Sequence, residues 1–355
     1  MADAAAVPAL DLTQPGQLLF IGCGGTELPD DVASLISEGR VGGLILFARN
    51  VRDPVQVRAL VDDAHSRAPA GTPLTVAIDQ EGGRVQRLRE PWTVWPPMGT
   101  VGARDDVALT RQVGFAMGRE LADQRIDLDF APSADVATNP TNPIIGDRSF
   151  AADPTSVSRH TCAFIEGMHE AGVATCAKHF PGHGDASVDS HLELPHLTCD
   201  WERLREVELP PFRALIDAGV PSVMTAHVLL EQIDSERPAT LSHDVISGLR
   251  GELGWDGLVF TDDLEMKAIA DHFTPEQIAR GALGAGVDAL LVCSQTDLRE
   301  ALLAQLERLP DALLEPALRR MGAFKARHSG GRFASGATPP YAEHRALAAS
   351  IEAAP

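Results

Sequence analysis

The segment 177–195 gathers side chains that transfer protons or bind metal ions. It contains three histidines, two aspartates and one lysine among glycines and prolines, and it follows an apolar run at 173–177. Lys178 is one of only three lysines in the chain, so its presence here indicates a specific role. A polar surface turn rarely collects histidine and lysine beside an apolar strand. We therefore interpret the segment as an active-site loop.

Two residues of this loop, Asp189 and His191, are suited to acid–base catalysis. They are two positions apart, so in an extended segment their side chains lie on the same side. A carboxylate that accepts a hydrogen bond from one ring nitrogen orients the imidazole and favours its charged form, so that His191 could donate a proton near neutral pH. Gly182 and Gly184 would give the loop the hinge-like freedom of a lid. The alternative is a structural hydrogen bond that only ties the loop down.

A metal site is another hypothesis for the loop, because histidine and aspartate are also metal ligands. Their spacing matches neither H-E-x-x-H nor a Cys/His finger, and the glycines and prolines prevent a helix that would place histidines on one face. We therefore expect no metal and no other cofactor. The residues of ligand type are His179, His183, Asp185, Asp189 and His191.

Apolar strands alternate with helices along the chain around this loop. Parallel strands need crossover connections of this kind. Eight units in about 310 residues predict an α/β fold with a single domain, a closed (β/α)8 TIM-type barrel. A doubly wound open sheet is the alternative, but Gly22-Cys-Gly-Gly25 does not fit the G-x-G-x-x-G fingerprint. The predicted strands are 17–23, 41–47, 74–79, 128–132, 173–178, 222–227, 257–262 and 289–293.

The predicted domain organisation has three parts. Residues 1–14 are expected to be a flexible N-terminal tail, and residues 15–328 the catalytic barrel. Residues 329–355 are expected to be a C-terminal extension that packs on the barrel or trails from it. Asp53 and Asp153 each precede a proline and are predicted to cap the helices that follow.

Ionisable residues follow several of the predicted strands. Barrel enzymes carry their working residues at the C-terminal ends of the strands, which meet at one face. The residues there therefore predict one polar pocket. In chain order they are Asp79, Arg87, Arg148, Lys178, His179, His227, Asp262 and Asp263.

Asp262 and Asp263 are neighbours at one strand end. Side chains alternate between the two faces of a strand, so we expect only one of the pair to face the pocket. The other would cap the next segment or bind backbone. An alternative is that both are caps for a helix at 264–270.

The overall charge and composition of the chain argue against several classes of protein. Thirty basic against 50 acidic residues give a net charge of −20, which argues against binding nucleic acid or an anionic membrane surface. No signal peptide and no membrane-spanning run are recognised, so we expect a cytoplasmic protein. The five scattered cysteines predict buried free thiols rather than disulfides.

Four motifs together resemble glycoside hydrolase family 3, and more narrowly its single-domain bacterial β-N-acetylglucosaminidases of peptidoglycan recycling. The most specific is Lys178-His-Phe-Pro-Gly-His-Gly-Asp-x-x-x-Asp-Ser-His191. The supporting motifs are Asp79-Gln-Glu-Gly-Gly-Arg-Val-Gln-Arg87, Gly146-Asp-Arg-Ser-Phe150 and Thr261-Asp-Asp-Leu-x-Met266. The resemblance extends from about residue 18 to residue 326.

The resemblance implies an exo-acting retaining β-N-acetylglucosaminidase that acts on terminal N-acetylglucosamine of cell-wall fragments. We also expect the protein to be a monomer. Asp262 would be the catalytic nucleophile, and His191 the general acid/base with Asp189 as its partner. The sugar-binding residues implied by the resemblance are Asp79, Arg87, Arg148, Lys178 and His179. A phosphorylase, a β-glucosidase, a catalytically inactive sugar-binding barrel and a metal hydrolase are the alternatives.

Overall fold

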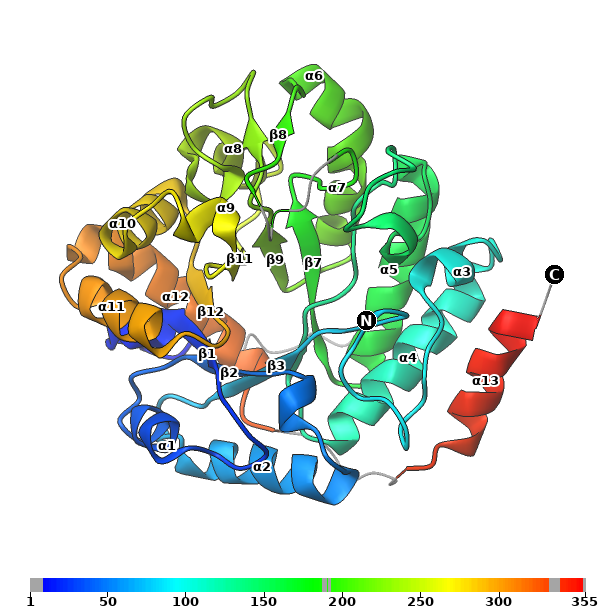
Figure 1. Ribbon diagram of the computed structural model, residues 1–355, viewed down its shortest axis with the longest axis horizontal. Helices are drawn as coiled ribbons and strands as arrows, with labels where there is room; N and C mark the ends of the chain where they lie inside the picture. Colours follow the sequence, from blue (N-terminus) through cyan, green and yellow to red (C-terminus); the bar gives the residue numbers. More distant parts are fainter. Residues whose placement is uncertain (1–8, 187–189, 191–192, 332–338, 354–355) are drawn as a thin grey trace.

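Eight parallel strands close into a barrel in the computed structural model, which describes residues 9–186, 190, 193–331 and 339–353 (Figure 1). Their order around the barrel is β1-β12-β11-β9-β7-β6-β3-β2. This confirms the predicted (β/α)8 fold, because every predicted strand supplies one barrel strand. The bounds are β1 Leu19–Gly22, β2 Gly43–Leu46, β3 Thr75–Ile78, β6 Leu128–Asp129, β7 Ala174–Phe180, β9 Ser222–Thr225, β11 Leu258–Asp263 and β12 Ala289–Val292.

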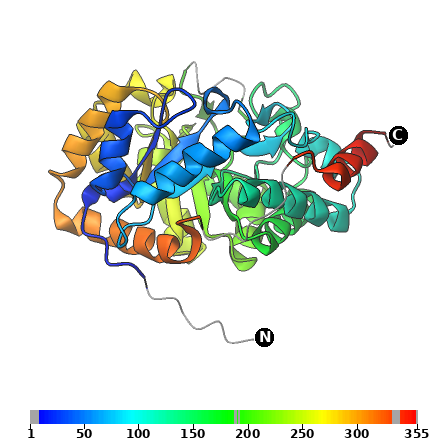
Figure 2. The same cartoon turned by 90° about the horizontal axis from the view of Figure 1, so that it is seen from below.

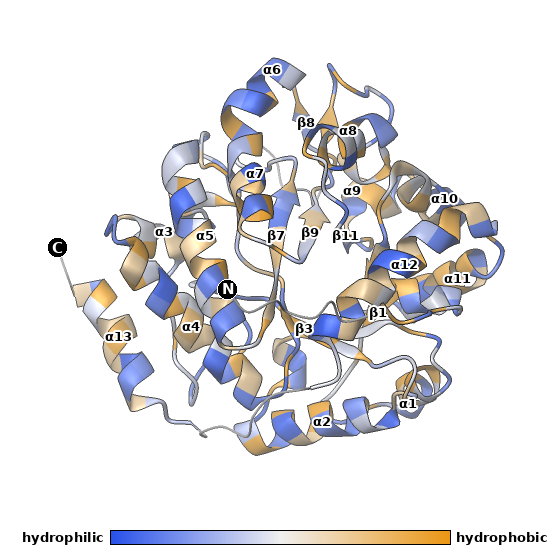
Figure 3. Ribbon diagram, turned by 180° about the vertical axis from the view of Figure 1, so that it is seen from behind, coloured by the Kyte–Doolittle hydropathy of each residue, from blue (hydrophilic) through white to orange (hydrophobic). Residues whose placement is uncertain are grey.

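Helices surround the barrel, and Figure 2 shows them lying along its outside. Figure 3 shows polar and apolar residues mixed along outer helices such as α2 and α10, as expected for helices with one face on the strands. None of the described helices is long and apolar enough to cross a bilayer. The bounds are α1 Asp30–Ser37, α2 Pro54–Arg67, α3 Met98–Gly102, α4 Val107–Asp123, α5 Pro154–Glu170, α6 Trp201–Arg203, α7 Leu209–Asp217, α8 His243–Ser247, α9 Lys267–Ala270, α10 Pro275–Ala285, α11 Thr296–Leu306, α12 Asp311–His328 and α13 Ala342–Ala353.

The predicted helix caps are confirmed. The Asp53 side chain accepts a hydrogen bond from the backbone N–H of Gln56 at 2.9 Å, and Asp153 does the same for Ser156 at 2.8 Å. Each satisfies one of the backbone donors that a helix N-terminus leaves free, and a proline occupies the next position, where no N–H is needed.

A short antiparallel hairpin, β4 Gln80–Gly82 and β5 Val85–Gln86, follows β3 directly. Its turn is closed by Gln80, whose side-chain oxygen accepts hydrogen bonds from the backbone N–H groups of Arg87 and Leu88 at 2.9 and 3.0 Å. The hairpin brings Glu81 and Arg87 back toward the end of β3. Sequence patterning did not reveal it, because its two strands are too short to show an alternation.

Aromatic rings fill the barrel interior beneath the functional face. Phe260 packs edge-on against Phe20 and Phe130, with ring centroids 4.9 and 5.3 Å apart, and Phe324 of α12 lies 6.3 Å away. Gly43 of β2 makes room for this layer. A Cβ at this position would lie 2.2 Å from the Phe20 ring and 2.8 Å from the carbonyl oxygen of Thr75.

Both terminal segments contact the barrel. Residues 9–14 were expected to belong to a flexible tail, but the N–H of Leu10 donates to the carbonyl of Gly322 at 3.2 Å and Leu12 is buried. Burial of this leucine against the helices gives the segment a fixed place. At the other end α13 lies beside α3 and α4 (Figure 1), where His344 Nδ1 is 2.8 Å from Glu120 Oε1.

The five cysteines are free thiols, and all but the partly buried Cys162 are buried. This confirms the prediction made from their scattered positions.

We expect Gly43→Ala to lower the free energy of unfolding by about 1–3 kcal/mol or more, because overpacking a barrel interior forces side chains and backbone to shift. Urea unfolding followed by circular dichroism measures it. Gly71→Ala is the control, since a Cβ there meets no atom within 4 Å. Equal stability of the two variants would contradict the role given to Gly43.

Candidate active site

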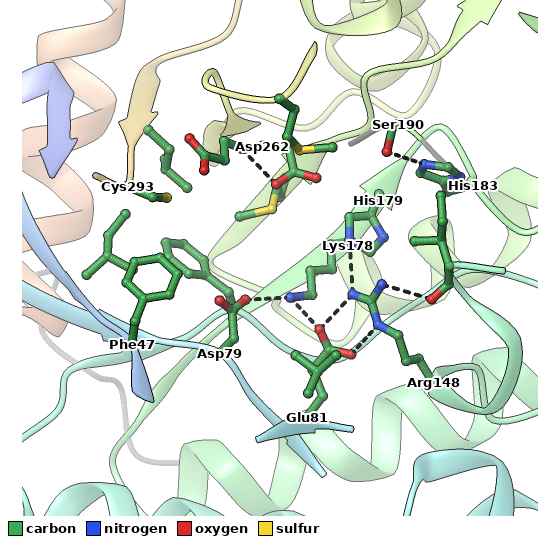
Figure 4. A pocket seen from close by; sticks show the side chains of 18 of the residues that line it. Phe47, Asp79, Glu81, Arg148, Lys178, His179, His183, Ser190, Asp262 and Cys293 are labelled. Carbon is green, nitrogen blue, oxygen red and sulfur yellow. Dashed lines mark hydrogen bonds and ion pairs between the residues drawn. The ribbon is translucent and has the colours of Figure 1, made fainter. Parts of the chain in front are cut away.

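A cavity of about 180 Å³, lined by both charged and apolar residues, lies at the C-terminal ends of the strands (Figure 4). Its lining comes from several strand ends, as barrel enzymes require. The structure therefore brings together residues as far apart in the chain as Ile45 and Cys293. The predicted site residues that line this cavity are Asp79, Arg87, Arg148, Lys178, His179 and Asp262.

Two predicted catalytic residues, Asp189 and His191, lie outside the described residues. Ser190 between them is described, is buried and lines the cavity. Its hydroxyl oxygen lies 3.1 Å from Nε2 of His183. Figure 4 marks this contact with a dashed line.

Lys178 is the central cation of the cavity wall. Its ammonium nitrogen lies 2.8 Å from Asp79 Oδ1 and 2.6 Å from Glu81 Oε1, and its side chain is 3% exposed. Burial disfavours the charged form of a lysine, but the two carboxylates outweigh burial and raise its pKa. Lys178 is therefore a permanent cation, and its three donors are aimed by two fixed acceptors.

Two arginines complete this charged wall. Arg148 binds Glu81 through two parallel hydrogen bonds of 2.8 Å, from Nε to Oε2 and from Nη2 to Oε1. Arg87 donates to Asp79 Oδ2 at 3.0 Å, and its guanidinium lies 5.4 Å from the centre of the Phe47 ring. Cations and anions thus alternate in the order Arg87, Asp79, Lys178, Glu81 and Arg148.

Glu81 was missed as a functional residue, although it lies two positions after Asp79 in a recognised motif. Burial opposes its ionisation, but Arg148 and Lys178 outweigh burial and lower its pKa. The same holds for Asp79, whose pKa is lowered mainly by Lys178 and Arg87 against the effect of burial. The available signal was the alternation of a strand, which places both carboxylates on one side.

Asp262 and Asp263 both line the cavity, and Asp263 also binds backbone, as expected for the second member of the pair: its Oδ1 accepts a hydrogen bond from the N–H of Glu265 at 3.1 Å. Strand β11 changes register against β12 between Phe260 and Asp263, and such a bulge re-aims side chains at a strand end. Neither residue caps the following helix, because α9 begins after Met266 without a side-chain cap. Strand β7 has the same kind of irregularity between Ala177 and Phe180, where Lys178 and His179 both reach the cavity.

The two neighbouring aspartates have opposite electrostatics. Burial would raise the pKa of Asp262, but the backbone N–H of Asp263, which donates to Oδ1 at 2.7 Å, and the nearby Lys178 ammonium help to lower it. Burial, reinforced by the charge of Glu265, raises the pKa of Asp263 to about 7. At neutral pH Asp262 is thus an anion facing the cavity, whereas Asp263 titrates.

A second aspartate–histidine pair lies deeper in the wall and was not anticipated. Asp135, which is fully buried, accepts a hydrogen bond from Nδ1 of His179 at 2.7 Å and one from the backbone N–H of His183 at 2.6 Å. His183 is buried as well, and burial together with nearby His179 lowers its pKa to about 4. No motif contains Asp135, so only the fold reveals it.

The glycines of the loop have a packing role that the hinge interpretation did not anticipate. A Cβ on Gly184 would lie 1.8 Å from the carbonyl oxygen of Val136, and one on Gly182 would lie 2.6 Å from Cγ of Glu208. Asn142 also binds the carbonyl oxygens of His183 and Gly184 at 2.8 and 3.0 Å. These close contacts require glycine and tie the loop down over this stretch.

The described residues contain no group of three or more histidine, cysteine, aspartate or glutamate side chains arranged to hold a metal ion. Among the ligand types considered from the sequence, Asp189 and His191 lie outside those residues.

We expect Asp263→Asn to stabilise the protein, and to do so more at pH 8 than at pH 5. A carboxyl with a raised pKa in the folded state costs stability once it ionises, so the cost grows as pH rises from about 4 toward 7. The difference between the two pH values should be about 2 kcal/mol, measured by urea unfolding. Asp262→Asn should act in the opposite direction at pH 8, because ionised Asp262 is stabilised in the fold. A gain from Asp263→Asn that does not change with pH would contradict this.

Comparisons with known proteins identify relatives over most of the chain. A model of the glycosyl hydrolase family 3 N terminal domain matches residues 12–322. A β-hexosaminidase of Alkalilimnicola ehrlichii is 43% identical over 301 residues, which are 82% of this chain and 84% of the relative.

Comparison with solved structures identifies relatives of the same family. The chain is similar to a glycoside hydrolase family 3 β-N-acetylglucosaminidase from Paenibacillus sp. str. FPU-7, with a TM-score of 0.90 and 39% identity over 95% of this chain and 67% of that one. It is also similar to NagZ of Neisseria gonorrhoeae in complex with N-trifluoroacetyl-D-glucosamine, with a TM-score of 0.82 and 29% identity over 94% of this chain and 97% of that one.

Proposed function

The chain belongs to glycosyl hydrolase family 3, and we propose that it is an exo-acting, retaining β-N-acetylglucosaminidase that releases terminal N-acetylglucosamine from peptidoglycan turnover fragments. Its enzyme class is that of a glycoside hydrolase of the β-N-acetylhexosaminidase type, in agreement with its β-hexosaminidase relatives. The finer points, which are the covalent mechanism, the site residues and the peptidoglycan substrate, are the proposal.

One observation carries the mechanism: Asp262 is an anion that lines the same cavity as the fixed cations Lys178 and Arg148. A retaining glycosidase needs a carboxylate that attacks the anomeric carbon of the sugar. Asp262 is ionised for this purpose and points into the cavity beside Lys178 and His179 (Figure 4). Asp79 and Glu81 are unsuited to the attack, because each is engaged by two cations.

The charged wall is suited to holding the hydroxyl and acetamido groups of one sugar. Asp79, Arg87, Arg148, Lys178 and His179 supply both donors and acceptors within the cavity. Its volume of about 180 Å³ is below the roughly 300–1,000 Å³ typical of sites for larger ligands, which supports the binding of one terminal ring. Hydrogen bonds from such buried, paired groups would reject a sugar that lacks the matching partner.

The reaction that we propose has two steps. Asp262 attacks the anomeric carbon and forms a glycosyl ester, while the departing oxygen takes a proton from His191. A water molecule then gives a proton to His191 and attacks the same carbon, which frees N-acetylglucosamine and restores the Asp262 carboxylate. Asp189 orients His191. In a phosphorylase, phosphate would replace the water.

A second candidate for the proton donor is Asp263, because its pKa of about 7 leaves it partly protonated at neutral pH. It follows the nucleophile directly and lines the same cavity. The experiments below separate it from His191.

We expect Asp262→Asn to lower kcat on a chromogenic N-acetyl-β-glucosaminide on the order of 10³–10⁵-fold, since the amide cannot form the ester. Release of the chromophore measures it, with burst kinetics of the wild type as a probe of the glycosyl-enzyme. Normal turnover by Asp262→Asn would exclude it as nucleophile.

Two further assays of the wild type test the substrate. Equal cleavage of a β-glucoside would exclude the acetamido preference, and failure to cleave a peptidoglycan fragment would exclude that substrate.

We expect the effect of His191→Ala on the hydrolysis rate to depend on the leaving group. An alkyl leaving group needs protonation and should lose about 10²–10⁴-fold in rate, whereas a nitrophenyl leaving group should lose far less. Asp263→Asn is the matched variant and should show no such dependence. The reverse pattern would assign the proton donor to Asp263. Product analysis with and without inorganic phosphate tests the phosphorylase alternative.

A further inference from the structure

We propose that Asp135 is a positioning residue which fixes the tautomer of His179 and, through it, the orientation of Arg148 in the cavity wall. The inference rests on the proposed function in that this wall is taken as the sugar site. Asp135 follows β6 and has no contact with the cavity of its own. It acts entirely through the residues that it holds.

Asp135 is saturated with hydrogen bonds. Its Oδ2 accepts from Nδ1 of His179 at 2.7 Å and from the hydroxyl of Ser133 at 2.9 Å. Its Oδ1 accepts from the backbone N–H groups of His183 at 2.6 Å and His179 at 3.3 Å. A carboxylate only accepts hydrogen bonds, so the proton between the two side chains belongs to Nδ1 of His179.

The other ring nitrogen of His179 faces Arg148. Nε2 lies 3.3 Å from Nη2 of Arg148, and a guanidinium only donates. Two donors repel each other at this distance, so Nε2 must accept and carries no hydrogen. The tautomer of His179 is therefore set from both sides, by an acceptor at Nδ1 and a donor at Nε2.

His179 adds a second contact at Nη2 to a guanidinium whose three nitrogens each have another partner. Glu81 binds Nε and Nη2, and Nη1 reaches the carbonyl oxygen of Ile144 at a longer 3.3 Å. His179 supplies the contact on the side of the cavity. The contacts from Asp135 through His179 to Arg148 thus hold a sugar-binding cation in place, and such contacts keep a site in its productive geometry.

The Asp135→Asn substitution tests this series of contacts, because the asparagine side chain has almost the same shape as that of aspartate. The two backbone N–H groups keep the amide oxygen at the Oδ1 position, so the amide NH₂ replaces Oδ2 and faces Nδ1 of His179. Nδ1 must then accept, the ring proton moves to Nε2, and Nε2–H meets the donor of Arg148. The variant should therefore lose the contact between His179 and Arg148.

The first measurement is the ¹⁵N spectrum of the His179 ring in the full-length protein. We expect a proton on Nδ1 and a bare Nε2 in the wild type, and the reverse in Asp135→Asn. A wild-type ring with a proton on Nε2, alone or together with Nδ1, would overturn the proposal. This wild-type result decides the matter even if the variant fails to fold.

The second measurement separates binding from turnover. We expect Asp135→Asn to raise KM for a chromogenic N-acetyl-β-glucosaminide by about tenfold to a hundredfold, with a smaller change in kcat, since the lost contact belongs to binding. Asp129→Asn is the matched control. Asp129 is also buried at the end of β6 and accepts from the backbone N–H of Gln80 at 2.9 Å, but it has no bond to His179.

The outcomes distinguish this inference from the proposed function. Equal increases in KM for both variants would show a general effect of the buried wall and overturn the role of Asp135. Unchanged KM and ring spectra in Asp135→Asn would overturn it too, while wild-type activity would still support the proposed function. Absence of wild-type activity on N-acetyl-β-glucosaminides would refute the proposed function and leave the ring spectra as the test of the tautomer.

Discussion

The buried ammonium of Lys178, held between Asp79 and Glu81, is the constraint on which the rest of the site depends. Removing a charge from water costs several kcal/mol, and an ion pair offsets this only with good geometry and further hydrogen bonds. Here the carboxylates of Asp79 and Glu81 pair with the ammonium, and each carboxylate is bonded in turn to an arginine. The β4–β5 hairpin has to fold back to place Glu81 against Lys178 of β7 and Arg87 against Asp79. One buried cation thus links the β4–β5 hairpin to β7, two segments that are far apart in the sequence.

Irregular strands aim the functional side chains. In regular β7 and β11 the side chains would alternate, and one of each neighbouring pair would leave the cavity. The register shifts in both strands bring Lys178 with His179, and Asp262 with Asp263, to the same opening. Each shift gives up regular ladder hydrogen bonds. The barrel tolerates this at its C-terminal rim, while its aromatic interior near Phe20 and Phe260 keeps the strands in place.

The cavity separates groups that keep their charge from groups that change it. Lys178, Arg148 and Glu81 are locked as ions by one another, so they can bind a neutral sugar over a wide range of pH. On the other side, Asp262 is kept ionised and Asp263 titrates near neutrality. Neighbouring groups whose surroundings push their pKa values apart are typical of acid–base chemistry. A neutral ligand and a reactive carboxylate are thus served by two different electrostatic environments within one cavity.

The sequence by itself determined the barrel, its eight strands, the caps at Asp53 and Asp153, and the polar residues at the strand ends. Apolar runs, helix caps and strand exits are local patterns, and local patterns are legible in a single chain. Glu81 and the pair Asp262-Asp263 lay within recognised motifs, but their roles did not follow from spacing. Only the tertiary structure decided that Glu81 binds two cations, that both aspartates line the cavity, and that Asp135 holds His179. These are contacts between segments far apart in sequence or effects of a strand bulge, and desolvation, which sets their charge states, exists only once the chain is packed.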